Sequence, residues 1–375
     1  MAADSKHAWV TLLTRPSYLA GVIILAHTLQ KYQTKYPLIV LVTDTLPEQC
    51  ITALEAEGQR TNQLHVHKVD PLLPLENVNL IAARFEDTWT KLRVFELITY
   101  DKIVFLDADI MICRNMDSLF NIPLPGPDWL AANHACVCNL DKDPWAPTDW
   151  CAETCAYTPM THPDALTHPT PVTKGARLTY HLLNSGLFIF RPSQDLWDNV
   201  LHFFNTSPKL KDFLFPDQNF LDEFFRHNWT SLGWQYNAVK TMRYWHPEMW
   251  RDGEVRGLHY IVDKPWQKRI ARDGIAGHLG RDAVTHGWWW DEYGRWERER
   301  EECGDEGTLK IVREHVAKQL TEEEDRKQVE ANGKAGFPIL VPGKPGVLED
   351  KSQPGGPVLR AKRPGERGHG PVVRN

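Results

Sequence analysis

Apolar residues follow two alternating patterns through the first third of the chain. Short continuous apolar runs have the length of strands, whereas the segments between them place apolar residues on one helical face. The strand-like runs span residues 9–13, 38–43, 64–69 and 103–106, and the helix-like segments span residues 17–29, 48–57 and 88–100. This alternation predicts an α/β fold, with a mainly parallel mixed sheet flanked by helices.

The pattern changes in the middle of the chain. Residues 126–174 are rich in Pro, Thr, Asp, His and Cys and show little periodicity, so they are predicted to form an insertion near the mouth of a site. Regular structure resumes with a strand at 187–190, a helix at 194–204 and a helix starting at Pro216. Residues 8–300 are therefore expected to form one domain.

The C-terminal part is charged and then loses its apolar pattern. Residues 301–332 are predicted to form a charged amphipathic helix. Residues 333–375 are dominated by glycine, proline and charge, and this composition favours a disordered tail. We assign no catalytic role to the tail.

Composition limits the classes of function. A chain of 375 residues with 42% hydrophobic residues has enough apolar side chains for a large core. Its net charge of -6 gives no basic field that would attract nucleic acid. The first residues show no secretory signal, and the apolar stretch at 19–26 is too short to span a bilayer. A cytoplasmic protein with no membrane or nucleic-acid partner is expected, and a homodimer is a further expectation.

Seven cysteines, an odd number, fit a reducing compartment better than a complete disulfide framework. Four of them, at positions 136, 138, 151 and 155, have the spacing C-x-C…C-x-x-x-C. Such a set can hold a structural zinc ion, although this is not a common zinc-finger spacing. Reduced thiols in a long insertion are the favoured interpretation, and zinc binding and disulfide pairing stay open.

The sequence DKIVFLDAD presents Asp107 and Asp109 at the end of a buried strand. Residues two apart on an extended segment point to the same side, so both carboxylates can bind one hard divalent cation. The end of a strand is where open α/β folds bind ligands. Asp141 and Asp143 have the same spacing but no apolar run before them, and they are interpreted as a solvated loop. Two solvated strand-end carboxylates remain the alternative for the first pair.

Three other segments agree with a ligand site. TLLTRPSY, residues 11–18, turns from strand to helix and offers backbone donors and an aromatic ring. Asn184-Ser185-Gly186 and Pro216-Asp217-Gln218 supply groups that hydrogen-bond sugar hydroxyls. In LHYIVDKPW, His259 is a candidate ligand for the same cation and Lys264 can neutralise a phosphate. Each segment alone also fits ordinary turn, cap or structural chemistry.

Taken in order, these motifs resemble the family-eight retaining glycosyltransferases, which include glycogenin, the galactinol synthases and the plant glucuronosyltransferases of xylan. The resemblance rests on VTLLT, WTKLRVFELITYDKIVFLDADIMICRNMDSLF, LLNSGLFIFRPS, PDQNFL and HYIVDKPW, between about residues 8 and 267. It implies a GT-A fold in a single catalytic domain, a UDP-sugar donor, a glycan or small polyol acceptor and a Mn²⁺ ion.

The resemblance also assigns site residues. It implies that Asp107, Asp109 and His259 are the metal ligands. Asp217, Gln218 and Asn184 fall on catalytic positions at the donor sugar and the reaction centre. The donor-binding positions are Leu12, Thr14, Arg15, Tyr18, Lys91, Ala108, Ser185 and Lys264.

The chain departs from the family pattern at three places. The glycogenin branch has asparagine where this chain has Arg15. Many relatives have a glycine between the motif's histidine and lysine, where this chain has Ile261, Val262 and Asp263. Tyr244 lies where a self-glucosylated tyrosine would be sought, but its surroundings do not match closely. Self-glucosylation is therefore a minority hypothesis.

The family is retaining, yet no carboxylate in the chain is an obvious covalent nucleophile. Attack by the acceptor on the face that UDP leaves, with Asp217 or Gln218 near the oxocarbenium-like centre, is the preferred mechanism. A binding protein without turnover is one alternative, which the retained metal ligands oppose. Nucleotidyl transfer is another, but residues 11–18 lack a glycine-rich phosphate loop. Three tryptophans at 288–290 are interpreted as packing rather than sugar stacking, and the donor sugar is left open.

Overall fold

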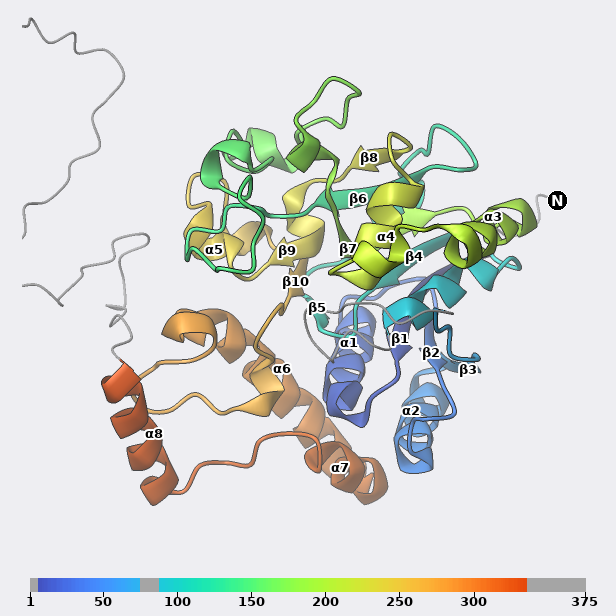
Figure 1. The fold of residues 1–375 in the computed structure, drawn as a ribbon. Coiled ribbons are helices and arrows are strands. Elements are labelled where there is room, and N and C mark those ends of the chain that lie inside the picture. The colour runs from blue at the N-terminus through green and yellow to red at the C-terminus, as the bar shows by residue number, and fades with distance from the viewer. Residues whose placement is uncertain (1–5, 75–87, 336–375) are drawn as a thin grey trace, which may run out of the picture.

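The centre of the computed structural model, which describes residues 6–74 and 88–335, is a seven-stranded mixed sheet (Figure 1). Its strands are β1 (His7–Leu13), β2 (Leu38–Val42), β3 (Leu64–Lys68), β4 (Lys102–Leu106), β6 (Leu130–His134), β7 (Leu183–Phe190) and β8 (Trp229–Ser231). Their order is β3-β2-β1-β4-β7-β6-β8. The first four of these strands are parallel, and β7 runs antiparallel to β4 and β6. The predicted α/β fold with a mixed sheet is confirmed.

A second sheet of three short strands continues from the first. It contains β5 (Ile110–Ile112), β9 (Ala238–Val239) and β10 (Gly257–His259), in the order β5-β10-β9. The antiparallel register pairs His259 with Ile110, the residue after Asp109. This pairing brings a histidine to the connection between β4 and β5 although the two segments lie far apart in the sequence.

Helices cover both faces of the main sheet. Figure 1 shows α1 (Leu19–Lys31) and α2 (Glu48–Thr61) on the side opposite to α3 (Gln194–Thr206) and α4 (Pro216–Phe224). Strand β4 explains this arrangement, because its side chains alternate between two cores. Val104 and Leu106 belong to the core with α1 and α2, whereas Ile103 and Phe105 belong to the core with α3 and α4. All four are fully buried, as the continuous apolar run predicted.

The predicted start of the insertion, at residue 126, is too early. Residues 130–134 form β6, which lies inside the main sheet between β7 and β8. Its sequence LAANH lacks the β-branched and aromatic residues that signal a strand, and its position comes from tertiary pairing. The excursion from the sheet therefore begins after His134.

The C-terminal region differs from the single helix predicted at 301–332. It contains α6 (Ala283–Glu302), α7 (Glu306–Arg313) and α8 (Glu322–Ala335). Gly304 separates the first two helices with a φ of 72°, a conformation that glycine adopts without steric cost. The tryptophans at 288–290 lie within α6 and outside the lining of the main cleft, in agreement with packing. The disordered tail was predicted to begin at residue 333, but residues 333–335 belong to α8. The rest of the predicted tail, residues 336–375, lies outside the described residues.

Two local predictions are also revised. Residues 88–96 form a 3₁₀ helix rather than the α-helix predicted at 88–100. Strand β7 begins at Leu183 rather than at residue 187, so Asn184, Ser185 and Gly186 lie in the strand. A short helix, α5 (Met242–Trp245), follows β9. Among the described residues, no helix combines the length and the apolar character needed to cross a bilayer.

Candidate active site

A cleft of about 480 Å³ opens where β1 and β4 end. Its lining includes every residue that the sequence analysis assigned to the site. These are Leu12, Thr14, Arg15, Tyr18, Lys91, Asp107, Ala108, Asp109, Asn184, Ser185, Asp217, Gln218, His259 and Lys264. The fold therefore gathers segments from six parts of the chain around one cavity.

Asp107, Asp109 and His259 form a compact set of potential metal ligands. One donor atom from each lies within 4.8 Å of the other two. His259 Nε2 is 3.3 Å from Asp109 Oδ1 and 3.8 Å from Asp107 Oδ2. Two carboxylates and an imidazole suit a divalent ion such as Mn²⁺, because oxygen and nitrogen donors of this kind bind borderline-hard cations. The donor set thus fits the metal that the family resemblance implies.

A chain of amides fixes the orientation of the His259 ring. Its Nδ1 is 2.9 Å from Asn237 Oδ1, and Asn237 Nδ2 donates to Asn184 Oδ1 at 2.8 Å. The carbonyl of Asn237 accepts the Nδ1 proton, which leaves Nε2 directed toward Asp107 and Asp109, where it can serve as a metal ligand. Gly186 makes room for the ring, since a Cβ there would lie 2.3 Å from His259 Cε1.

Lys91 links Asp107, one of the candidate metal ligands, to Asp217. Its Nζ is 2.8 Å from Asp107 Oδ1 and is also paired with Asp217 Oδ2. Ser185 Oγ donates to the same Asp217 oxygen at 2.8 Å. Burial lowers the pKa of Lys91, but Asp107 and Asp217 outweigh burial and hold the pKa above its usual range. Lys91 is therefore a buried, permanently charged cation beside the cleft.

Lys264 supplies a second buried cation on the other side of the carboxylates. Its Nζ is paired with Asp109, donates to Tyr260 O at 2.7 Å and lies 5.6 Å from the centre of the Tyr18 ring. Burial raises the pKa of Asp109, but Lys264 and His259 outweigh it and hold this pKa well below its usual range. Asp109 is thus a carboxylate at neutral pH.

The turn between the two aspartates packs tightly against α1. A Cβ on Gly21 would lie 2.3 Å from Ala108 O, so this close approach requires glycine. Trp266 Nε1 donates to Ser17 O at 2.8 Å and ties the segment after Lys264 to the turn before α1. The donor-binding segments predicted from the sequence are therefore in direct contact.

The loop between His259 and Lys264 has an unusual backbone conformation. Val262 has a φ of 63° although it is β-branched and 47% exposed. This left-handed region is strongly disfavoured for such a residue and easy for glycine. Val262 therefore adopts a backbone conformation that a glycine at this position would adopt without strain.

Sequence reasoning missed an aromatic wall of the cleft. Trp145, Trp150 and Phe215 all line it, with ring centres 5.7–6.3 Å apart, and Trp150 and Phe215 are nearly parallel. Trp145 and Trp150 lie in the aperiodic segment, where only an excess of tryptophan could have indicated them. Asn237 was missed as well, because no motif marks it.

Two other expectations need correction. Asp141 is not solvated, since its carboxylate pairs with Arg281 at 2.7 Å and its side chain is 9% exposed. Asp143, its partner in the second pair, lines the cleft. The Tyr244 hydroxyl is buried and lies outside the lining of the cleft, an arrangement that does not support self-glucosylation.

Comparison with known proteins identifies the family. Residues 9–269 match the family described as glycosyl transferase family 8. The chain belongs to this family. It is therefore a glycosyltransferase that uses a nucleotide-sugar donor, and its α/β architecture is the GT-A fold. The resemblance seen in the sequence motifs is confirmed.

Two curated plant proteins are similar to this chain over most of its length. The chain is 29% identical over 292 residues to galactinol synthase 2 of Arabidopsis thaliana, covering 77% of this chain and 81% of that protein. It is 28% identical over 296 residues to galactinol synthase 1 of Solanum lycopersicum, covering 77% and 82%.

Two solved structures share the fold at low sequence identity. The galactosyltransferase LgtC, solved with donor and acceptor sugar analogs, has a TM-score of 0.51 and 18% identity, covering 77% of this chain and 95% of that one. The bifunctional glycosyltransferase WbbM has a TM-score of 0.51 and 16% identity over 79% of this chain. The chain spans about half, 52%, of the WbbM chain.

Proposed function

We propose that this family member is a Mn²⁺-dependent retaining hexosyltransferase that moves a sugar from a UDP-sugar to a hydroxyl of a small polyol or glycan. The observation that carries the proposal is the placement of Asp107, Asp109 and His259 within 4.8 Å of one another, between two buried lysines. When bound there, Mn²⁺ would neutralise charge on the leaving diphosphate.

The protein's own residues account for the remaining steps. Lys91 and Lys264 supply fixed positive charge for the phosphates, in a partly closed cleft where such charge is more effective than in water. Asn184 and Gln218 are joined by a long contact of 3.5 Å and present amide groups to the donor sugar. Asp217 is held by Lys91 and Ser185, so it orients that lysine beside the reaction centre.

The aromatic wall supports a separate acceptor subsite. Trp145 and Trp150 line the cleft and come from residues 139–154, a different part of the chain from the candidate metal ligands. Indole faces stack on the apolar faces of sugars and cyclic polyols. The relatives named galactinol synthases support a polyol acceptor, because galactinol is a glycosylated polyol. A cytoplasmic location and a homodimer stay predictions from the sequence.

The first experiment measures UDP release from a panel of UDP-sugars, with Mn²⁺ or with EDTA and with polyols or oligosaccharides as acceptors. We expect one preferred sugar, loss of release in EDTA and a fall of at least ~100-fold in Asp109→Asn. Asp195→Asn, an exposed change on α3, is the matched control and should behave as wild type. Metal-independent release, or full activity of Asp109→Asn, would contradict the proposed metal role.

An alternative is a protein that binds the donor without turnover. This alternative predicts Mn²⁺-dependent binding of UDP in calorimetry with no release from any sugar or acceptor in the panel. Turnover with any acceptor excludes it.

A further inference from the structure

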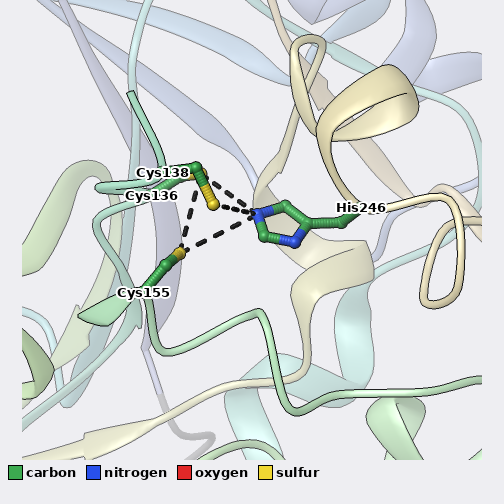
Figure 2. Close-up of side chains that lie close together, drawn as sticks. All are labelled: Cys136, Cys138, Cys155 and His246. Carbon is green, nitrogen blue, oxygen red and sulfur yellow. Dashed lines mark hydrogen bonds between the residues drawn. The ribbon is translucent and has the colours of Figure 1, made fainter. Parts of the chain in front are cut away.

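Three cysteines and a histidine meet at the base of the aperiodic segment (Figure 2). Cys136 and Cys138 follow β6, Cys155 ends a short 3₁₀ helix, and His246 directly follows α5. One donor atom from each residue lies within 4.8 Å of the other three. The group therefore joins three separate parts of the chain at one point.

Cys151 is not a member of this group, although the sequence placed it with the other three cysteines. Its Sγ lies 3.4 Å from Thr154 Oγ1, and the cluster of potential ligands does not include it. His246, about ninety residues further along the chain, takes the fourth position. No spacing rule could have found this ligand from the sequence.

The distances between the donor atoms match a single tetrahedral ion. With Zn–S of about 2.3 Å and Zn–N of about 2.0–2.1 Å, tetrahedral ligands lie about 3.8 Å apart for two sulfurs and about 3.5 Å apart for sulfur and nitrogen. Cys136 Sγ and Cys155 Sγ are 3.9 Å apart. His246 Nε2 lies 3.3, 3.2 and 3.8 Å from the sulfurs of Cys136, Cys138 and Cys155. Figure 2 shows that all three sulfurs point toward the same ring nitrogen.

Burial argues against an accidental meeting of thiols. Cys155 is fully buried, Cys138 is 2% exposed and His246 is 6% exposed. Packing four polar ligands together in an apolar region has a cost, and a shared ion with strong bonds compensates for it. A disulfide between Cys136 and Cys155 would require the sulfurs to approach to about 2.05 Å. It would also give no reason for Cys138 and His246 to lie beside them.

We propose that Cys136, Cys138, Cys155 and His246 bind one structural Zn²⁺ ion. Four protein ligands fill the tetrahedron, so the site is closed to substrate and serves the fold. The ion joins the end of β6 to the segment after α5 and closes the loop at residues 139–154. That loop carries Trp145 and Trp150, and Cys136 itself lines the cleft. The ion would thus fix the aromatic wall of the cleft.

The test uses the full chain, purified without metal-affinity steps, and measures bound metals by mass spectrometry of the elements. We expect about one zinc per chain after dialysis without added metal. Cys138→Ser and His246→Ala should each lose most of it, with a fall in Tm of roughly 5 °C or more. Cys151→Ser is the matched control, since it lies in the same segment outside the cluster, and it should keep the zinc.

Two further measurements apply if the variants fold poorly. His246→Cys replaces the imidazole with a fourth thiolate and should therefore retain zinc. If His246 only filled space in the fold, His246→Cys would contain no zinc. In the wild-type protein, replacement of zinc by Co²⁺ should give the intense visible bands of a tetrahedral thiolate complex. A chain without metal whose Cys136, Cys138 and Cys155 react freely with a thiol reagent would overturn the proposal, as would a mapped disulfide or bound iron in place of zinc.

Discussion

Asn237 Oδ1 accepts a hydrogen bond from His259 Nδ1 at 2.9 Å, and this bond aims the other ring nitrogen at Asp107 and Asp109. Asn237 is fully buried, so water cannot replace it. We expect Asn237→Leu to weaken Mn²⁺ binding by about 10–100-fold. Calorimetric titration with Mn²⁺ measures this change directly. Asn237→Asp keeps the acceptor and should retain most of the affinity, and equal losses in both variants would disprove the orienting role.

Gln218 and Asp217 should differ in their effects on turnover. Gln218 is partly exposed to the cleft, whereas Asp217 is 5% exposed and bound to Lys91. We expect Gln218→Ala to lower kcat by about 100-fold with unchanged Mn²⁺ affinity. Asp217→Asn should lower kcat and also the Tm, because it removes one of the two charges that balance Lys91. Near-wild-type steady-state rates in both variants would remove these residues from the reaction centre.

The aromatic wall leads to a prediction about the acceptor. Trp150→Ala should raise the KM for the acceptor by about 10-fold and leave the KM for the UDP-sugar unchanged, because a stacking contact contributes about 1–2 kcal/mol. Trp288→Ala, on α6 and outside the cleft, is the control. If the donor KM rises instead, the wall belongs to the donor subsite.

The backbone of Val262 gives a prediction about stability. Because its φ of 63° disfavours a β-branched residue, Val262→Gly should leave the free energy of unfolding unchanged or raise it by about 1 kcal/mol. Val172→Gly, in a loop and outside the residues with positive φ, should lower it by about 1 kcal/mol or more, because this side chain also packs against the core. Urea unfolding of the two variants measures the contrast, and equal losses would argue against strain at Val262.

We expect the folded protein to lose stability in mild acid because of His286. Burial first, and then the charges of Lys240 and Lys264, lower its pKa to about 3. Lys240 Nζ donates to His286 Nε2 at 3.2 Å and pairs with Asp282 at 2.7 Å, and the Tyr260 ring lies against the imidazole. The neutral ring is thus the native form.

The sign follows from proton binding. Below pH 6.5 the unfolded chain protonates this histidine and the folded chain does not, so stability falls with pH until about pH 3. At pH 5 the loss is about 2 kcal/mol. His286→Gln, which keeps an acceptor for Lys240, should flatten the difference between unfolding at pH 7 and pH 5. An unchanged pH dependence in this variant would show that other groups control it.

Periodicity and motifs predicted the parts of the molecule that local sequence determines. The burial of Ile103 to Leu106 on both faces follows from an apolar run, and the position of Asp107 at the strand end follows from that strand. The resemblance placed His259 in the same site, although only the pairing of β10 with β5 explains how it arrives there.

The parts that could not be predicted depend on tertiary contacts. Strand β6 is alanine-rich and can be recognised only from the strands that pair with it. The apolar periodicity of α6 is weak in the sequence, because the helix contains three consecutive tryptophans and many charged residues. Asn237 and His246 act through partners far away in the sequence, at Asn184 and Cys136. No local pattern carries such information.

The two ends of the excursion after β6 meet on the sheet. His134 pairs with Leu183 across adjacent strands, and Ala135 N donates to Leu182 O at 2.9 Å, so residues 135–182 leave and return at one point. A segment anchored in this way can be shortened, lengthened or exchanged without changing the register of the strands that carry the donor site. Because the tryptophans of the proposed acceptor wall and three of the proposed zinc ligands lie on this segment, we expect that exchanging it between relatives that keep His246 would change the acceptor preference and leave the proposed donor site in place.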